Sequence, residues 1–366
     1  MIPTRVGTAT SQPIDVLNPA RLAPVGGEML KRFCLLLAAM SASYNSAAHH
    51  AAAGIYDRND IGEIEGEIVS VFWRNPHVRL EIARDVGQGP DQIWEVEFGS
   101  VNTVERLGVA RDSVQVGDRV SVSGSLGRNG RPVMFAGAIT LSTGEELTLQ
   151  AAAPIRYGLN EASLQASRDA DQELRSDIFR VWIPNSRPET GSGTTIYPLT
   201  EAGRVAQASW DAADDPALQC IPPGLPTAMD NPYPVEFVDE GDRILMRLEE
   251  WDGVRTIFMD PENVGEPIQP RMGVSKGTLD GRMLSVATTD IEWRYIDDLG
   301  TPQSEDVLIE ETFTLSEDGT TLAWEARITD PVNFTEPVVM TGDWVWLAGQ
   351  EIKPFNCALP ASDAGG

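Results

Sequence analysis

Residues 93–125 read IWEVEFGSVNTVERLGVARDSVQVGDRVSVSGS and carry the pattern that decides the fold of the first half of the chain. Polar and apolar residues alternate over 93–98 and again over 119–125, which is typical of half-buried strands. Between these segments, Ser100 is suited to cap the start of a short amphipathic helix and Gly108 is suited to end it. The stretch therefore predicts two strands separated by one helix.

Three more alternating segments complete this pattern, at 64–73, 78–83 and 133–141. Five strands with a helix between the third and the fourth follow the element order of the OB-fold, a small Greek-key barrel. We therefore predict an OB-like five-stranded barrel over 49–150.

The second half of the chain is also predicted to be mainly β. Residues 151–175 are polar and contain several alanines, and we expect a partly helical linker there. Short alternating segments with hairpin-sized breaks then recur at 235–238, 243–251, 254–259, 282–288, 292–295, 307–315, 321–329 and 338–347. Roughly eight successive strands favour a lipocalin-like antiparallel barrel, or a strongly curved sheet, over 176–366.

The N-terminal region predicts export. Lys31 and Arg32 precede the apolar run FCLLLAAM, and small residues follow it up to Ala48. This is the order of a cleavable signal peptide, and the apolar run is shorter than the ~20 residues that span a bilayer. We assign 29–48 to the signal peptide and 1–28 to a non-native upstream extension. The mature chain is expected in the periplasm, not inserted in the membrane.

The charge balance argues against a nucleic-acid partner. The chain carries 28 Lys and Arg against 55 Asp and Glu, which gives a formal net charge of −27. Phosphate binding depends on clustered basic side chains, so this surface should repel nucleic acid and anionic lipid. The carboxylates are spread along the chain, which indicates an acidic surface and not an acidic binding tail.

Two cysteines, Cys220 and Cys357, remain after the predicted cleavage. They lie far apart in the sequence, whereas metal and redox sites favour close C-x-x-C spacing. In an oxidising compartment such a pair predicts a disulfide, worth roughly 4–5 kcal/mol in the chain-entropy model.

Both halves of the chain resemble uncharacterised exported bacterial families. The first half does so through HH at 49–50, WRNPHV at 73–78 and VGDRVSVSG at 116–124. The second half resembles a separate exported β domain through CIPPG at 220–224, NPYP at 231–234, GTPQSE at 300–305 and TDP at 329–331. The resemblance implies a fusion of two domains of unknown function and says little about chemistry.

The three histidines of the chain, His49, His50 and His77, predict a metal site in the first domain. Cleavage after Ala48 would give His49 a free α-amine beside its own imidazole, and a second imidazole would complete a histidine brace. Such nitrogen donors suit copper best among the divalent metals, with zinc as the alternative, for metal handling or redox chemistry. The competing interpretation is a polar terminus without a metal and a structural His77 at a barrel edge.

Aromatic residues of the second half predict a ligand site. Trp251, Trp293, Tyr295, Trp324 and Trp344 lie mostly on predicted strands, and a barrel of this size can enclose one small ligand. The alternative is that these side chains simply fill the interior. We expect a non-catalytic periplasmic binding protein for a small hydrophobic or amphipathic molecule, and the sequence does not indicate a protein partner.

Enzymatic motifs are scarce. No G-x-S-x-G elbow, phosphate loop, dinucleotide fingerprint or H-E-x-x-H occurs, and 176–366 contains no histidine. A pair of carboxylates is able to do acid–base chemistry, so a carboxylate-based enzyme of the second β domain is kept as an alternative. The carboxylates considered are Asp290, Glu292, Asp297, Asp298, Glu305 and Glu310.

Overall fold

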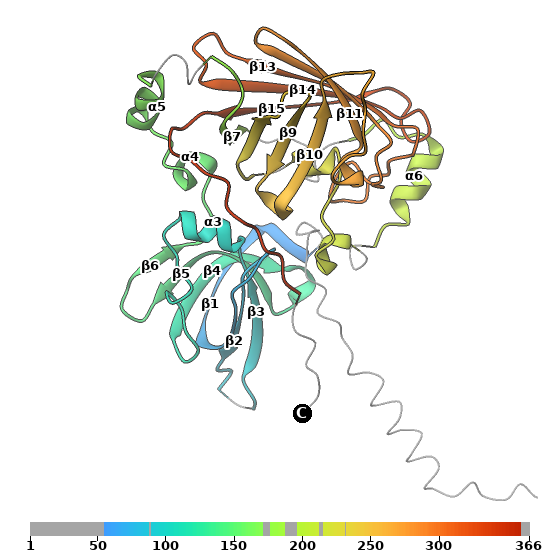
Figure 1. The fold of residues 1–366 in the computed structure, drawn as a ribbon. Helices are drawn as coiled ribbons and strands as arrows, with labels where there is room; N and C mark the ends of the chain where they lie inside the picture. The colour runs from blue at the N-terminus through green and yellow to red at the C-terminus, as the bar shows by residue number, and fades with distance from the viewer. Residues whose placement is uncertain are drawn as a thin grey trace, which may run out of the picture. The chain divides into compact units, whose positions relative to one another are not determined.

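Two β-structures follow one another along the chain (Figure 1), and the prediction of a mainly β protein is confirmed. The computed structural model describes residues 55–87, 89–170, 176–186, 196–211, 215–230 and 232–359. All of them belong to one compact unit, Ala48–Gly366. The predicted signal peptide, the upstream extension, His49 and His50 lie outside the described residues.

The first β-structure is a six-stranded sheet in which five strands close into a ring. The strand order is β3-β2-β1-β4-β5-β6, and a parallel pairing between β3 and β5 closes the ring. Helix α3 lies between β3 and β4 in the chain, so the arrangement is the predicted OB-like one, with β6 added beside β5. The bounds are β1 Tyr56–Phe72, β2 Arg79–Arg84, β3 Gln92–Glu97, α3 Val101–Arg106, β4 Arg119–Gly127, β5 Val133–Leu141 and β6 Glu146–Thr148.

Local sequence explains two features of this ring. Helix α3 begins where predicted, because the Ser100 side chain accepts a 3.1 Å hydrogen bond from the backbone N–H of Thr103. Strand β4 approaches β5 closely at Gly124, where a Cβ atom would collide with the carbonyl oxygen of Phe135. The β4–β5 register shifts between Ser123 and Gly124, and such a bulge bends a strand as ring closure requires.

Short helices connect the two β-structures, as predicted for 151–175. The Asn160 side chain accepts from the Ser163 backbone N–H, and the Ser163 hydroxyl accepts from the Asn160 N–H, which together form a capping box. In the described part of the chain, no helix is long and apolar enough to cross a membrane. The helices are α4 Ala153–Arg156, α5 Glu161–Arg168 and α6 Glu201–Ala208, with the 3-10 helices η1 Arg128–Gly130, η4 Pro216–Gln219, η5 Thr227–Met229, η6 Glu250–Asp252 and η7 Pro270–Met272.

The second β-structure is a closed barrel in which each strand pairs with its sequence neighbours and β15 pairs with β7. A ring of antiparallel pairs needs an even number of strands, so a nine-stranded ring requires a parallel pair. That pair is β10–β11, with Ile257 opposite Ser275. The bounds are β7 Val181–Ser186, β8 Val235–Asp239, β9 Arg243–Leu248, β10 Gly253–Phe258, β11 Val274–Asp280, β12 Met283–Thr289, β13 Leu308–Leu315, β14 Thr321–Thr329 and β15 Val338–Val345.

The predicted barrel is confirmed, but its strand list needs correction. The sequence patterns miss β7, which carries Pro184, a residue unusual inside a strand, and they miss β11, whose residues are mostly polar. The predicted strand at 292–295 is wrong, because Tyr295 forms only an isolated bridge with Pro302 and this segment belongs to a loop. Nine strands with one parallel pair also differ from the eight-stranded antiparallel barrel of lipocalins.

A polar network crosses the interior of the barrel. Arg255 of β10 is fully buried, and its guanidinium donates to both carboxylate oxygens of Glu311 on β13. Its Nε–H donates to Ser275 at 2.9 Å, and Nη2 donates to Thr288 at 2.7 Å. The indole N–H of Trp324 adds a 3.0 Å hydrogen bond to Glu311. Each charge is therefore paired, as burial of an ion pair requires.

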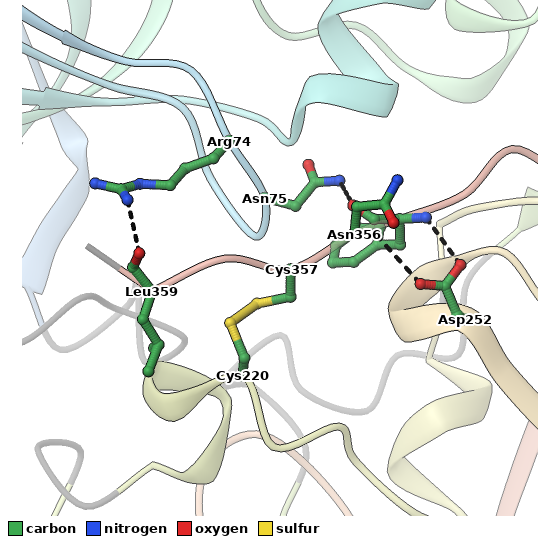
Figure 2. Close-up of a disulfide and its surroundings, with 8 residues drawn as sticks. Arg74, Asn75, Cys220, Asp252, Asn356, Cys357 and Leu359 are labelled. Atoms are coloured by element: carbon green, nitrogen blue, oxygen red, sulfur yellow. Dashed lines mark hydrogen bonds between the residues drawn. A yellow bond between two sulfur atoms is a disulfide. The ribbon is translucent and has the colours of Figure 1, made fainter. Parts of the chain in front are cut away.

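The C-terminal segment 353–359, which we call the strap, is held to the barrel side by a disulfide (Figure 2). The predicted bond between Cys220 and Cys357 is confirmed, with the two Cα atoms 5.8 Å apart. The backbone N–H of Asn356, which precedes Cys357, donates to the carboxylate of Asp252 at 3.2 Å. Asp252 also accepts from the N–H of Phe355.

The strap also contacts the first β-structure. Arg74, two residues after β1, donates to the carbonyl oxygen of Leu359 at 2.7 Å (Figure 2). Asn75 forms a parallel bridge with Cys357 and donates through its side chain to the carbonyl of Phe355. The strap thus bonds to residues of both β-structures, and the disulfide ties it to Cys220.

Candidate functional site

A pocket of about 740 Å³ lies beside His77, and we call it the His77 pocket. The first β-structure supplies most of its lining, and the linker and the loop before β8 supply the rest. The lining residues are Tyr56, Arg58, His77, Gly99, Ser100, Thr103, Ser125, Phe135, Leu149, Gln150, Ala151, Ala152, Arg156, Pro232 and Tyr233. A pocket of this volume is large enough for a small organic ligand.

Glu97 holds two of the lining side chains in place. Its carboxylate is 1% exposed and accepts a 3.3 Å hydrogen bond from the hydroxyl of Tyr56. The other carboxylate oxygen is in hydrogen-bond contact with Nδ1 of His77. An ionised carboxylate only accepts, so we assign the proton to Nδ1, and Nε2 is the ring nitrogen not engaged by Glu97.

Tyr56 acts as a hydrogen-bond donor in this cluster. Burial, and then the negative charge of Glu97, raise the pKa of Tyr56 well above its ordinary value. The phenol therefore stays protonated throughout the physiological range. Its ring lies 5.5 Å from the ring of Phe135, which His77 also approaches edge-on at 5.8 Å.

The sequence analysis found His77 but missed Glu97. Glu97 ends β3, and β2 runs antiparallel to β3 with Arg79 opposite Glu97, so His77 lies just before the start of the neighbouring strand. One signal was available: Glu97 stands between Val96 and Phe98, two residues typical of a core. A carboxylate in such a place needs a buried partner.

A second part of the pocket lining is built around Tyr233. Its hydroxyl donates to the Ser100 hydroxyl at 2.8 Å and accepts a longer, 3.4 Å contact from Thr103. Burial raises the pKa of Tyr233 to about 12. The N-cap serine of α3 therefore also fixes a barrel-side residue of the pocket.

The predicted metal site is only partly described. His77 lies in the pocket, whereas His49 and His50 fall outside the described residues. Within the described ranges, no group of three His, Cys, Asp or Glu side chains is placed to hold a metal ion. The copper or zinc site stays a prediction that depends on the two N-terminal histidines.

The five predicted ligand-binding aromatic residues do not form one cluster. Trp324 and Trp344 are 2% and 4% exposed, lie in the main barrel core and face each other at 6.0 Å. Trp293 and Tyr295 pair at 5.8 Å in the loop that replaces the predicted strand. Trp251 belongs to a separate cluster that includes strap residues. Their role in ligand binding stays a prediction.

The carboxylates considered for an enzyme include one with a clear structural use. Asp297 is 3% exposed, and its side chain accepts from the backbone N–H and the hydroxyl of Thr301 and from the N–H of Leu299. These bonds shape the loop between β12 and β13. The enzyme alternative is not tested by this placement.

A match to a known family covers part of the first β-structure. Residues 38–134 match the model of a family described only as a family of unknown function, DUF6152. The matched segment contains Tyr56, His77 and Glu97 and ends before Phe135. It agrees with the resemblance of the first half to an uncharacterised family, whereas the resemblance of the second half stays an expectation. No curated protein matches the chain.

Proposed function

We propose that the mature chain is an exported, non-catalytic binding protein that takes a small amphipathic molecule in the His77 pocket. The observation that carries the proposal is the pocket itself, whose volume of about 740 Å³ falls in the range of ligand pockets. Phe135 and Pro232 are partly exposed and offer apolar surface, while His77 and Arg58 offer polar groups. Such a mixed lining suits a ligand with an apolar body and a polar end.

Preorganisation supports the same proposal. The Tyr56 and His77 side chains are already bonded to Glu97, and the Tyr233 hydroxyl is already bonded to Ser100. A ligand that enters the pocket therefore does not have to order these side chains, and less of its binding free energy is lost to conformational entropy.

Retention of a native ligand tests this function. The full chain is purified from the periplasm and examined by native mass spectrometry and by organic extraction, beside an Ala152→Trp variant. Ala152 lines the pocket and is exposed, so an indole there should occupy the opening without removing a buried contact. We expect wild type to retain a small molecule and the variant to lose it.

Ala110→Trp is the matched control, because Ala110 is also exposed but lies outside the lining residues. It should retain the ligand as wild type does. Retention in Ala152→Trp would contradict the proposal. So would a wild-type protein that carries no molecule and that no member of a small amphipathic library stabilises against heat.

A second candidate function, copper or zinc binding, is favoured by the contact between His77 and Glu97. Metal-bound histidines commonly donate their other ring N–H to a carboxylate, which fixes the tautomer. Here Nδ1 contacts Glu97, so Nε2 would be the ligand atom. His50 precedes Tyr56 by six residues, an extended length of about 20 Å, so the chain length allows His49 and His50 to reach the same pocket.

Metal content of protein with a verified His49 N-terminus tests this candidate. We expect one copper or zinc ion per chain, lost in His77→Ala and bound roughly 10–100-fold more weakly in Glu97→Gln. Glu95→Gln is the control, since Glu95 lies on the same strand but pairs with Arg79. Absence of stoichiometric metal, or metal that neither His77→Ala nor Glu97→Gln affects, would exclude it.

A further inference from the structure

The charged residues that line the His77 pocket are basic, whereas the chain as a whole is acidic. The chain has about twice as many Asp and Glu as Lys and Arg, with 55 against 28. The described residues that line the pocket nevertheless include Arg58, His77 and Arg156 and no Asp or Glu. Glu97 lies behind this lining, where Tyr56 and His77 occupy its two oxygens. The pocket therefore presents basic groups in an otherwise acidic molecule.

Arg156 is the basic group whose bonding is incomplete. Nη1 donates to the carbonyl of Pro232 and Nη2 to the carbonyl of Ala151, both at 3.1 Å. Neither acceptor carries a charge, and no carboxylate of the described residues pairs with this guanidinium within 4 Å. Its Nε–H is buried and has no hydrogen-bond partner among the described residues.

An unpaired buried donor of this kind has a cost. Leaving a buried N–H without an acceptor costs about 1–3 kcal/mol, and more for a charged group. Native proteins leave few such groups, and each needs an explanation. Arg156 lines the pocket and has no carboxylate partner among the described residues, so an anionic ligand would supply the missing counter-charge. A carboxylate meets this need best, because its two oxygens match the planar fork of a guanidinium.

We infer that the ligand of the His77 pocket is an amphipathic carboxylate whose anionic end is received by Arg156 and whose apolar body lies against Phe135 and Pro232. This inference rests on the proposed binding function and names the class of its ligand. The two carbonyl bonds of Arg156 hold the guanidinium in place before the ligand enters, and Arg58 adds a second positive charge at the pocket.

Matched pairs of probes test the inference on the full chain. Benzoate is compared with benzamide, and 2-naphthoate with 2-naphthamide, by ligand-detected NMR titration. Each pair has the same apolar body and differs in the anionic group. We expect each carboxylate to bind at least about tenfold more tightly than its amide, and Arg156→Gln to remove this difference. Arg271→Gln should keep it, because Arg271 is also partly buried and bonded to a backbone carbonyl, but lies outside the pocket.

A second measurement does not depend on the folding of the Gln variant. In 15N-labelled wild type, the arginine Nε–H resonance that is missing from Arg156→Lys should shift with benzoate and stay in place with benzamide. Equal binding of carboxylate and amide, or a preference that persists in Arg156→Gln, overturns the inference and leaves the proposed function standing. Failure of every probe to bind also overturns it, while the retained-ligand experiment with Ala152→Trp decides on the proposed function separately.

Discussion

Buried carboxylic acids of this protein differ in how their oxygens are satisfied. Both oxygens of Glu97 have donors, from Tyr56 and His77. Asp215 is 6% exposed, and one of its oxygens accepts from the N–H of Ala217, while the other has no hydrogen-bond partner among the described residues. Burial raises the pKa of Asp215 to about 6, from an ordinary value of 3.8. Asp215 is therefore a group that destabilises the fold when it is charged.

The change Asp215→Asn should stabilise the protein at neutral pH. A raised pKa in the folded state means that the stability present below pH 3.8 is lost as the pH rises through about 6. Asn keeps the acceptor for Ala217 without the charge. We expect a gain in the free energy of unfolding of up to roughly 3 kcal/mol at pH 7, shrinking to nothing near pH 4, by urea titration at several pH values.

Asp318→Asn is the control, and its effect on the free energy of unfolding at neutral pH should have the opposite sign. Hydrogen bonds from Ser316 and the Thr320 N–H lower the pKa of Asp318, so the stability it contributes is present at neutral pH and is lost as the pH falls through that lowered pKa. A stabilising effect of Asp215→Asn that is equal at pH 4 and pH 7 would contradict this account of the charge.

At the scale of the elements, the barrel strands alternate buried and exposed residues, and the polar network places charged side chains at some of the buried positions. On β14 the buried residues alternate strictly with exposed or partly exposed ones, as a closed barrel requires. On β13 the same alternation places Glu311 among the inward residues. The ion pair with Arg255 therefore links β10 to β13 across the interior, and hydrophobic packing surrounds it.

Glu311→Gln should destabilise the barrel strongly. The change leaves the fully buried guanidinium of Arg255 without its counter-charge, and breaking one partner of a buried pair typically costs about 3–5 kcal/mol. Chemical denaturation followed by tryptophan fluorescence measures the loss. Glu310→Gln, at an exposed position on the same strand, should change stability by less than about 0.5 kcal/mol. Similar effects of the two changes would contradict the role of the ion pair.

The disulfide links the strap to the loop before β8. Cys220 and Cys357 are separated by 137 residues, so in the chain-entropy model the bond contributes roughly 5 kcal/mol to the free energy of unfolding. The double variant Cys220→Ser, Cys357→Ser should lose stability on this scale. Wild type measured with a reductant should fall to the level of the variant, and the variant should not respond to reductant. A variant as stable as oxidised wild type would exclude a stabilising role.

At the scale of the whole molecule, Glu249 connects the first β-structure, the barrel and the strap. It follows β9, is fully buried, and receives Arg106 of α3 through two hydrogen bonds of 2.5 and 2.6 Å. Asn102 of α3 donates to the same carboxylate at 3.0 Å, and so does the backbone N–H of Lys353 in the strap at 2.9 Å. One carboxylate on the barrel thus accepts hydrogen bonds from the first β-structure and from the strap.

Arg106→Gln should weaken the coupling between the two β-structures. It leaves the buried Glu249 without a counter-charge, at a cost of about 3–5 kcal/mol, and we expect the heat-unfolding transition in calorimetry to broaden or split. Arg119→Gln is the control, because the Arg119 side chain is 78% exposed and its nearest carboxylate is 4.0 Å away. A single sharp transition at the wild-type temperature would show that Glu249 does not couple the two.

The sequence by itself determined the class of fold, because period-2 alternation is a local property. It placed β1 to β5, helix α3 with its Ser100 cap, and most barrel strands near their observed positions. It also paired Cys220 with Cys357, because these are the cysteines left in the predicted mature chain. These features follow from residues close in sequence or from a simple count.

Only the tertiary structure decided how distant residues meet. His77 was visible in the sequence, but strand register brings Glu97 to it and a short helix brings Arg156 to the same pocket, which no local pattern encodes. The parallel β10–β11 pair likewise follows from the closure of an odd-numbered ring. Long-range pairing therefore forms the candidate site mostly from the first β-structure. The aromatic residues had instead suggested a site inside the barrel.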